Sequence, residues 1–122
     1  MFARWGEAFT QGARLFDAGA FFEAHEAWEA LWLAEREHVA RRVLQGLIQI
    51  AAGYHQYFVK GRPDSAARLL QRGLAKLTID EAGRFNFSSF CDGVRANVAT
   101  LSSADKPLVP ADVPHFALQA KV

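Results

Sequence analysis

The chain has 122 residues, 51% of them hydrophobic and 22% charged, a composition that is typical of one folded domain and excludes a disordered or fibrous protein. Its formal net charge of +1 lacks the excess of positive charge on which nonspecific nucleic-acid binding depends, so we do not expect a nucleic-acid partner. The single cysteine, Cys91, excludes an intrachain disulfide framework; with no signal-peptide pattern and no long apolar window, we expect a cytoplasmic protein without a membrane partner.

Helical periodicity recurs along the chain. Apolar residues at intervals of three and four predict a first helix that Gly19 ends and a second helix that ends near Glu35–Glu37. The third helix is apolar over about half of its circumference, which predicts a central position. Pro63 suits the first turn of the fourth helix, and Ser88 suits the N-cap of the fifth. The expected ranges are about 2–17, from 21 to between 35 and 37, 38–59, 63–78 and from 88 onward.

The predicted fold class is all-α, a compact bundle of about five helices in residues 1–104. The short connections favour antiparallel packing of consecutive helices. Residues 105–122 contain three prolines, so we expect an extended C-terminal tail that packs on the bundle. Val109, Phe116 and Leu118 are the residues expected to anchor it.

The sequence FFEAHEAWEALWL in the second predicted helix concentrates polar groups among large aromatic residues. His25 and Glu29 are four residues apart and therefore neighbours on one helix face, and Glu26 is three residues from Glu29. Trp28 and Trp32 lie beside them. A histidine and two carboxylates next to aromatic side chains cost free energy unless they are paired, hydrated or used. We therefore take these five residues as the candidate site.

The third predicted helix carries a second polar feature. Gln45, Gln49 and Gln56 fall within about 40° of one another around the helix axis. Gly46 and Gly53, seven residues apart on the same helix, indicate that another backbone approaches closely. The glutamines either face water or form hydrogen bonds to the histidine and carboxylates of the second helix.

Three runs of residues resemble one known family. They read FDAGAFFEAHEAWEALWL, LQGLIQIAAGYH and GRPDSAARLLQRGLAKL, and in this order they resemble the small prokaryotic family catalogued as domain of unknown function 309, over about residues 10–80. The resemblance implies a compact all-α bundle of about five helices. It also implies a polar core of His25, Glu26 and Glu29 opposite Gln45 and Gln49, and no established activity.

A binding or adaptor role without catalysis is the first interpretation of this polar seam. Aromatic walls with a few polar groups are typical of ligand pockets, and Trp28 and Trp32 would form such a wall. The ligand would be a small molecule or another protein, with a homodimer as one arrangement.

A metal-dependent hydrolase is the second interpretation. The sequence HEAWE has the spacing of the zincin motif HExxH, in which two side chains four residues apart bind zinc and the glutamate is the general base. His25 and Glu29 would then be ligands of zinc, manganese or iron. A catalytic zinc needs a third protein ligand, and His55 is the mid-chain candidate unless it is a core histidine.

A purely structural network is the third interpretation. Paired with Arg41, Arg42 or the glutamines, the motif would fix how the second and third helices cross. Arg14 of the first helix is another candidate partner. The sequence leaves these three interpretations, and the question of enzymatic activity, open.

Overall fold

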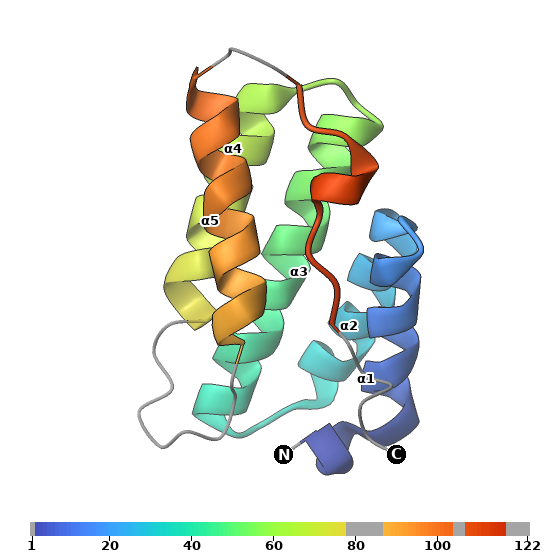
Figure 1. Ribbon diagram of the computed structural model, residues 1–122. Helices are drawn as coiled ribbons and strands as arrows, with labels where there is room; N and C mark the ends of the chain where they lie inside the picture. The colour runs from blue at the N-terminus through green and yellow to red at the C-terminus, as the bar shows by residue number, and fades with distance from the viewer. Residues whose placement is uncertain (1, 78–86, 104–106, 117–122) are drawn as a thin grey trace.

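The computed structural model describes residues 2–77, 87–103 and 107–116, and it confirms an all-α bundle (Figure 1). The elements are α1 (Phe2–Asp17), α2 (Phe21–Ala34), α3 (His38–Phe58), α4 (Pro63–Leu77), α5 (Ser88–Ser103) and the single-turn 3₁₀ helix η1 (Pro110–Asp112). These bounds agree with the predicted helices to within three residues, the largest difference being the end of α2. None of the helices in the described ranges has the length and apolar character needed to cross a membrane.

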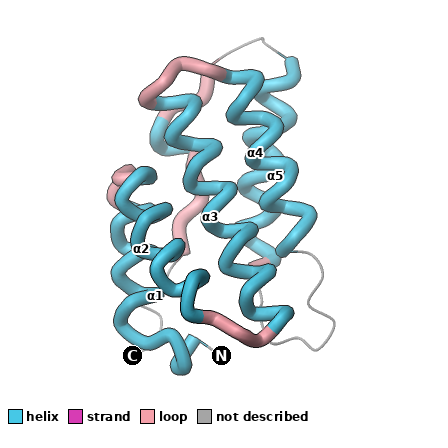
Figure 2. Tube along the Cα trace, turned by 180° about the vertical axis from the view of Figure 1, so that it is seen from behind, coloured by secondary structure: helices cyan, strands magenta, loops and turns pink. Residues whose placement is uncertain are grey.

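Helix α3 lies at the centre, as its broad apolar surface predicts. Helices α1 and α2 lie along one side of it and α4 and α5 along the other, an arrangement that is clear from the front and from behind (Figures 1 and 2). Leu44, Leu47 and Ile50 of α3 are fully buried. Helix α3 therefore contacts a helix on each side, α2 on one and α4 on the other.

The contact between α3 and α4 is made through glycines, as predicted from Gly46 and Gly53. A Cβ atom built on Gly46 would lie 2.9 Å from the backbone oxygen of Gly73 in α4. A Cβ atom on Gly53 would lie 2.9 Å from the side chain of Leu70. Only glycine allows the two backbones to approach this closely, which explains why α3 tolerates residues that weaken a helix.

An aromatic cluster holds α1 and α2 against the rest of the bundle. Trp28 is completely buried, its ring centroid 6.0 Å from both Phe9 and Phe16. The Trp28 indole Nε1–H donates a hydrogen bond to the Phe9 carbonyl at 3.3 Å. At the turn between the helices, Gly19 adopts φ of 85°, a left-handed conformation that ends α1 where the sequence predicted.

Residues 107–116 form a strap that runs across the front of α3, between α5 and the α1–α2 pair (Figure 1). The Leu108 N–H donates to the Tyr57 hydroxyl at 2.9 Å, and the Asn97 side chain donates to the Asp112 carbonyl at 3.2 Å. The Phe116 N–H donates to Asp17 Oδ1 at 3.1 Å. The strap is therefore fixed to α3, α5 and α1 in turn.

The anchors of the strap differ in part from those expected. Phe116 packs into the aromatic core, as predicted, with its ring centroid 4.4 Å from that of Phe90. The prediction for Val109 is wrong: its side chain is 48% exposed, whereas Leu108 and Val113 are buried. The turn of η1 inside the strap shifts the inward-facing positions, and Leu118 lies outside the described residues.

Candidate functional site

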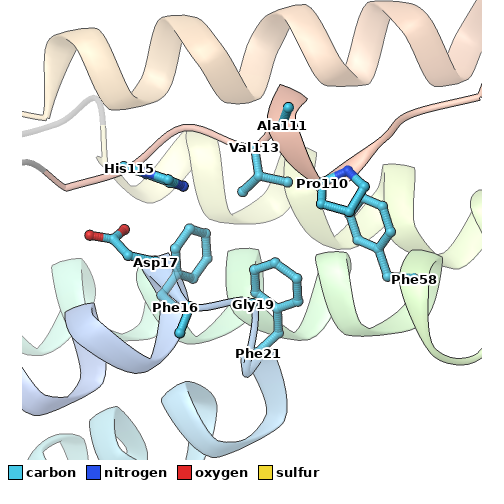
Figure 3. A pocket seen from close by; sticks show the side chains of 10 residues that line it. Phe16, Asp17, Gly19, Phe21, Phe58, Pro110, Ala111, Val113 and His115 are labelled. Carbon is cyan, nitrogen blue, oxygen red and sulfur yellow. The ribbon is translucent and has the colours of Figure 1, made fainter.

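A pocket opens where the strap passes over the turn between α1 and α2 (Figure 3). Its volume is about 610 Å³, within the range of small-molecule sites. Three segments far apart in the sequence form it: the end of α1 with the following turn, the end of α3, and the strap. The lining residues are Phe16, Asp17, Ala18, Gly19, Phe21, Phe58, Pro110, Ala111, Val113 and His115.

The inner wall of the pocket is aromatic. The ring of Phe21 lies 5.1 Å from Phe16, edge to face, and 6.0 Å from Phe58, stacked. Pro110 and Val113 of the strap cover these rings from the other side (Figure 3). Such a surface favours an apolar ligand, because burying apolar area releases about 25 cal/mol per Å².

Asp17 and His115 supply the polar groups at one end of the pocket, opposite Phe58 (Figure 3). Burial raises the pKa of the Asp17 carboxyl, while the hydrogen bond from the Phe116 N–H and the nearby His115 partly oppose this change. The Phe116 bond engages Oδ1 of the carboxylate. The other oxygen can accept a hydrogen bond from a ligand that carries a donor or a positive charge.

Sequence reasoning missed this pocket, although Asp17 carries one local indication of it. Asp17 is the last residue of α1, where the partial negative charge of the helix end disfavours a carboxylate. A residue that conflicts with its local environment indicates a functional or tertiary role. The contribution of the strap has no comparable sequence signature.

The motif on α2 is placed differently from the pocket. Helix α2 buries Phe21, Ala24 and Trp28. Glu29 lies about 100° around the helix from Trp28 and Glu26 about 200°, and both carboxylates are exposed. The buried aromatic residues Phe21 and Trp28 and the two carboxylates of the motif therefore occupy different faces of α2.

His25 lies between these two faces and is half-buried; its Nδ1 is buried and has no hydrogen-bond partner in the described ranges. The exposed ring of Phe22 stacks on His25 at 5.7 Å and contacts the ring of half-buried His55 at 5.4 Å. The two histidines therefore flank one aromatic ring. Within residues 2–77, 87–103 and 107–116, no group of three histidine, cysteine, aspartate or glutamate side chains is placed to hold a metal ion. The zinc, manganese or iron site stays a prediction.

The expected contact between the glutamines of α3 and the α2 carboxylates is not formed by Gln49. Its Oε1 instead accepts a hydrogen bond from Lys76 of α4 at 2.8 Å. The glycines on α3 explain this, because they direct the adjacent stripe of the helix toward α4. Gln45 lies on the same stripe and is half-buried.

Arg41 and Trp32 form the polar connection between α2 and α3 that the structure does contain. The Arg41 guanidinium lies 3.8 Å from the centroid of the Trp32 ring. It also donates to the carbonyl oxygens of Trp32 at 2.7 Å and Glu35 at 3.2 Å, at the end of α2. A cation at the C-terminal end of a helix is stabilising, so this contact fixes how the two helices meet.

Comparison with known proteins gives one result. A family model described as a domain of unknown function (DUF309) matches residues 9–69, half of the 122 residues. No curated protein and no solved structure matches the chain. The matched range includes α2, all of α3 and the aromatic wall of the pocket.

Proposed function

We propose that this chain, which belongs to the DUF309 family, is a non-catalytic binding domain. Its pocket under the strap would hold a small apolar ligand with a cationic head group. The observation that carries the proposal is the placement of one carboxylate, Asp17, at the end of a pocket walled by Phe16, Phe21 and Phe58. The binding site is thus assigned to the strap pocket rather than to the polar seam predicted on α2.

The walls argue for an apolar body in the ligand. Three aromatic rings and the side chains of Pro110 and Val113 offer dispersion contacts and few hydrogen bonds. A volume of about 610 Å³ accepts a molecule of one or two rings. A strongly hydrated ligand body would lose its hydrogen bonds to water there, and these walls would not replace them.

The head group follows from Asp17. A partly buried carboxylate is stabilised by an approaching ammonium group, which offsets the cost of its burial. An anionic ligand would instead meet a like charge. We therefore expect amines to bind more tightly than alcohols of the same shape, and alcohols more tightly than acids.

Titration calorimetry with 2-phenylethylamine, 2-phenylethanol and 3-phenylpropionate tests this order. We expect the amine to bind at least tenfold more tightly than the acid. Asp17→Asn should remove the preference for the amine and retain binding of the alcohol. Asp92→Asn is the matched control, because Asp92 is an exposed carboxylate paired with Arg95 on α5.

Two results would contradict the proposal. One is tighter binding of the acid than of the amine. The other is unchanged amine affinity in Asp17→Asn, which would place the ligand elsewhere. Chemical-shift changes in backbone amides, mapped on Gly19 and Val113, identify the occupied site independently of affinity.

The motif on α2 supports a second candidate function, binding of a divalent cation. His25 Nδ1 is buried and has no partner, and Glu29 follows one helical turn later. Two ligands of this kind suit zinc or manganese when other groups complete the coordination. A rise in melting temperature with zinc or manganese that disappears in His25→Ala would support this candidate, and stoichiometric metal in untagged protein would establish it.

A further inference from the structure

A band of positive charge follows the junction of α3 and α4, on the side of α3 away from the strap pocket. Phe58 lines the pocket, and Gln56 lies about 200° around the helix from it. Near Gln56 the band contains a small hollow of about 260 Å³. Its lining residues are Gln56, Arg62, Ser65, Arg68, Leu69 and Arg72.

Among the residues that the structure describes, no carboxylate forms an ion pair with the arginines of the hollow. The ion pairs among the described residues join Arg14 to Glu7 and Arg95 to Asp92, on other helices. Arg68 makes one long contact, 3.5 Å to the Ser65 hydroxyl. Three arginines therefore line one hollow, and none of them forms an ion pair with a described carboxylate, although Asp64 lies one helical turn from Arg68.

The band of positive charge continues along α3 and α4 through Arg42, Arg72 and Lys76. The pKa of Lys76 is lowered, first by burial and then by repulsion from Arg42 and Arg72. Like charges held together in this way are stabilised by a counter-ion. The net charge of +1 conceals this local excess, because Asp64 is the acidic residue of α4 whereas the helix carries Arg68, Arg72 and Lys76.

Two buried polar atoms along the same band lack hydrogen-bond partners in the described part of the chain. They are Gln56 Oε1, in the hollow, and Arg42 Nε, further along α3 and outside the hollow. A buried polar atom without a partner costs free energy, so the amide of Gln56 is open to a ligand. An oxyanion accepts hydrogen bonds, as Oε1 does, so its partner would be the NH₂ group of the same amide turned by 180°.

We propose that this hollow is a binding site for a small phosphate-type oxyanion, such as pyrophosphate or the phosphate group of an ester. Arginine is the side chain best suited to this role, because its guanidinium group pairs with phosphate oxygens through two parallel hydrogen bonds. Arg62, Arg68 and Arg72 would contact the oxygens from α4 and the preceding turn, and Gln56 from α3. The site is independent of the strap pocket and of its ligand.

Titration calorimetry with pyrophosphate and with inorganic phosphate, at constant ionic strength, tests the site directly. Arg72→Gln should weaken pyrophosphate binding at least tenfold, since it removes one of the three guanidinium groups. Arg36→Gln should change binding less than twofold. Arg36 is a suitable control because it is also an exposed arginine but lies in the turn between α2 and α3, about 27 Å along α3 from Gln56.

Gln56→Glu provides a second test with opposite effects on binding and stability. The substitution keeps the shape of the side chain and places a carboxylate among the three arginines. We expect pyrophosphate binding to disappear while the melting temperature rises, because the new carboxylate replaces the anion. Unchanged binding in this variant would overturn the proposal.

The remaining outcomes separate a built site from general attraction to positive charge. Equal weakening by Arg72→Gln and Arg36→Gln would show a nonspecific effect and overturn the proposal. The proposal would also be overturned if an oligonucleotide bound more than tenfold more tightly than pyrophosphate and pyrophosphate did not displace it. This result would identify the whole band as a nucleic-acid surface. If inorganic phosphate and pyrophosphate bind equally, the occupant is a free phosphate. If pyrophosphate binds more tightly, the occupant is a phosphate ester or a diphosphate. Both results support the site.

Discussion

The α2 motif and the strap pocket differ in how they bring chemical groups together. The motif gathers His25, Glu26 and Glu29 within five residues of sequence, yet both carboxylates are exposed. The pocket joins Asp17 to a strap residue, Phe116, that lies 99 positions away. In this protein, the residues of the motif are close in the sequence but do not form the pocket. The segments that meet in the pocket are far apart in the sequence, and little in their local sequence marks them.

The physical reason lies in how a helix divides its surface. Neighbouring residues on a helix point about 100° apart, so a compact motif is distributed over most of the circumference. A concave site needs side chains from several elements, and therefore needs long-range contacts. The predictions below test this comparison, from the largest expected effect to the smallest.

Trp28→Ala tests the buried face of the motif and should have the largest effect. Trp28 is completely buried between Phe9 and Phe16, so its truncation should lower the free energy of unfolding by about 3–5 kcal/mol. Chemical denaturation measures this loss. A loss below about 1 kcal/mol would show that the aromatic cluster is not the core of the α1–α2 pair.

Phe116→Ala tests the attachment of the strap. Phe116 is half-buried and stacks on Phe90 at 4.4 Å, so we expect a loss of about 2 kcal/mol, smaller than for a fully buried aromatic residue. Binding of 2-phenylethylamine should weaken as well, because the strap forms one wall of the pocket. Val109→Ala is the control, since Val109 lies on the exposed side of the strap.

Asp17→Asn tests the pocket through its dependence on pH. Because burial raises the pKa of Asp17 above its ordinary value of 3.8, the folded state binds the proton more tightly than the unfolded state does. This contribution to stability is complete below pH 3.8 and is lost as the pH rises through the folded-state pKa. Asp17→Asn should remove this decline, which thermal unfolding between pH 3 and 7 measures. A variant with the same decline as the wild type would assign it to another group.

Glu29→Ala tests the exposed face of the motif and should have the smallest effect. Glu29 is exposed, so the free energy of unfolding should change by less than about 0.5 kcal/mol. Glu26→Ala should behave in the same way. A loss above about 2 kcal/mol for either variant would restore the interpretation of the motif as a buried structural network.

The fold follows closely from the sequence because its determinants are local. The helix ends at Gly19, Gly61 and Pro63 depend on residues within a turn of each end, and the wide apolar face of α3 marks the central helix. The glycines Gly46 and Gly53 also indicated a close backbone contact correctly. What they did not indicate was the partner, since a small residue permits an approach by any helix.

The candidate site was harder to derive because the apolar pattern of α2 misleads. Phe22 and Leu33 are apolar but exposed, 46% and 69% respectively. They broaden the apparent apolar face of the helix toward Glu26 and Glu29, so that the carboxylates seem to border the core. Phe21, Ala24 and Trp28 define the true buried face, and composition alone does not distinguish the two sets.

The hydrogen bond between Phe116 and Asp17 has a consequence for the order of folding. It closes a loop of nearly the whole described chain, and the entropy cost of closing so long a loop is recovered only when the helices already bring its ends together. The pocket is therefore expected to be among the last parts of the molecule to form. A ligand that enters the pocket binds only the fully folded protein. It would slow the detachment of the strap more than it would slow the unfolding of any single helix.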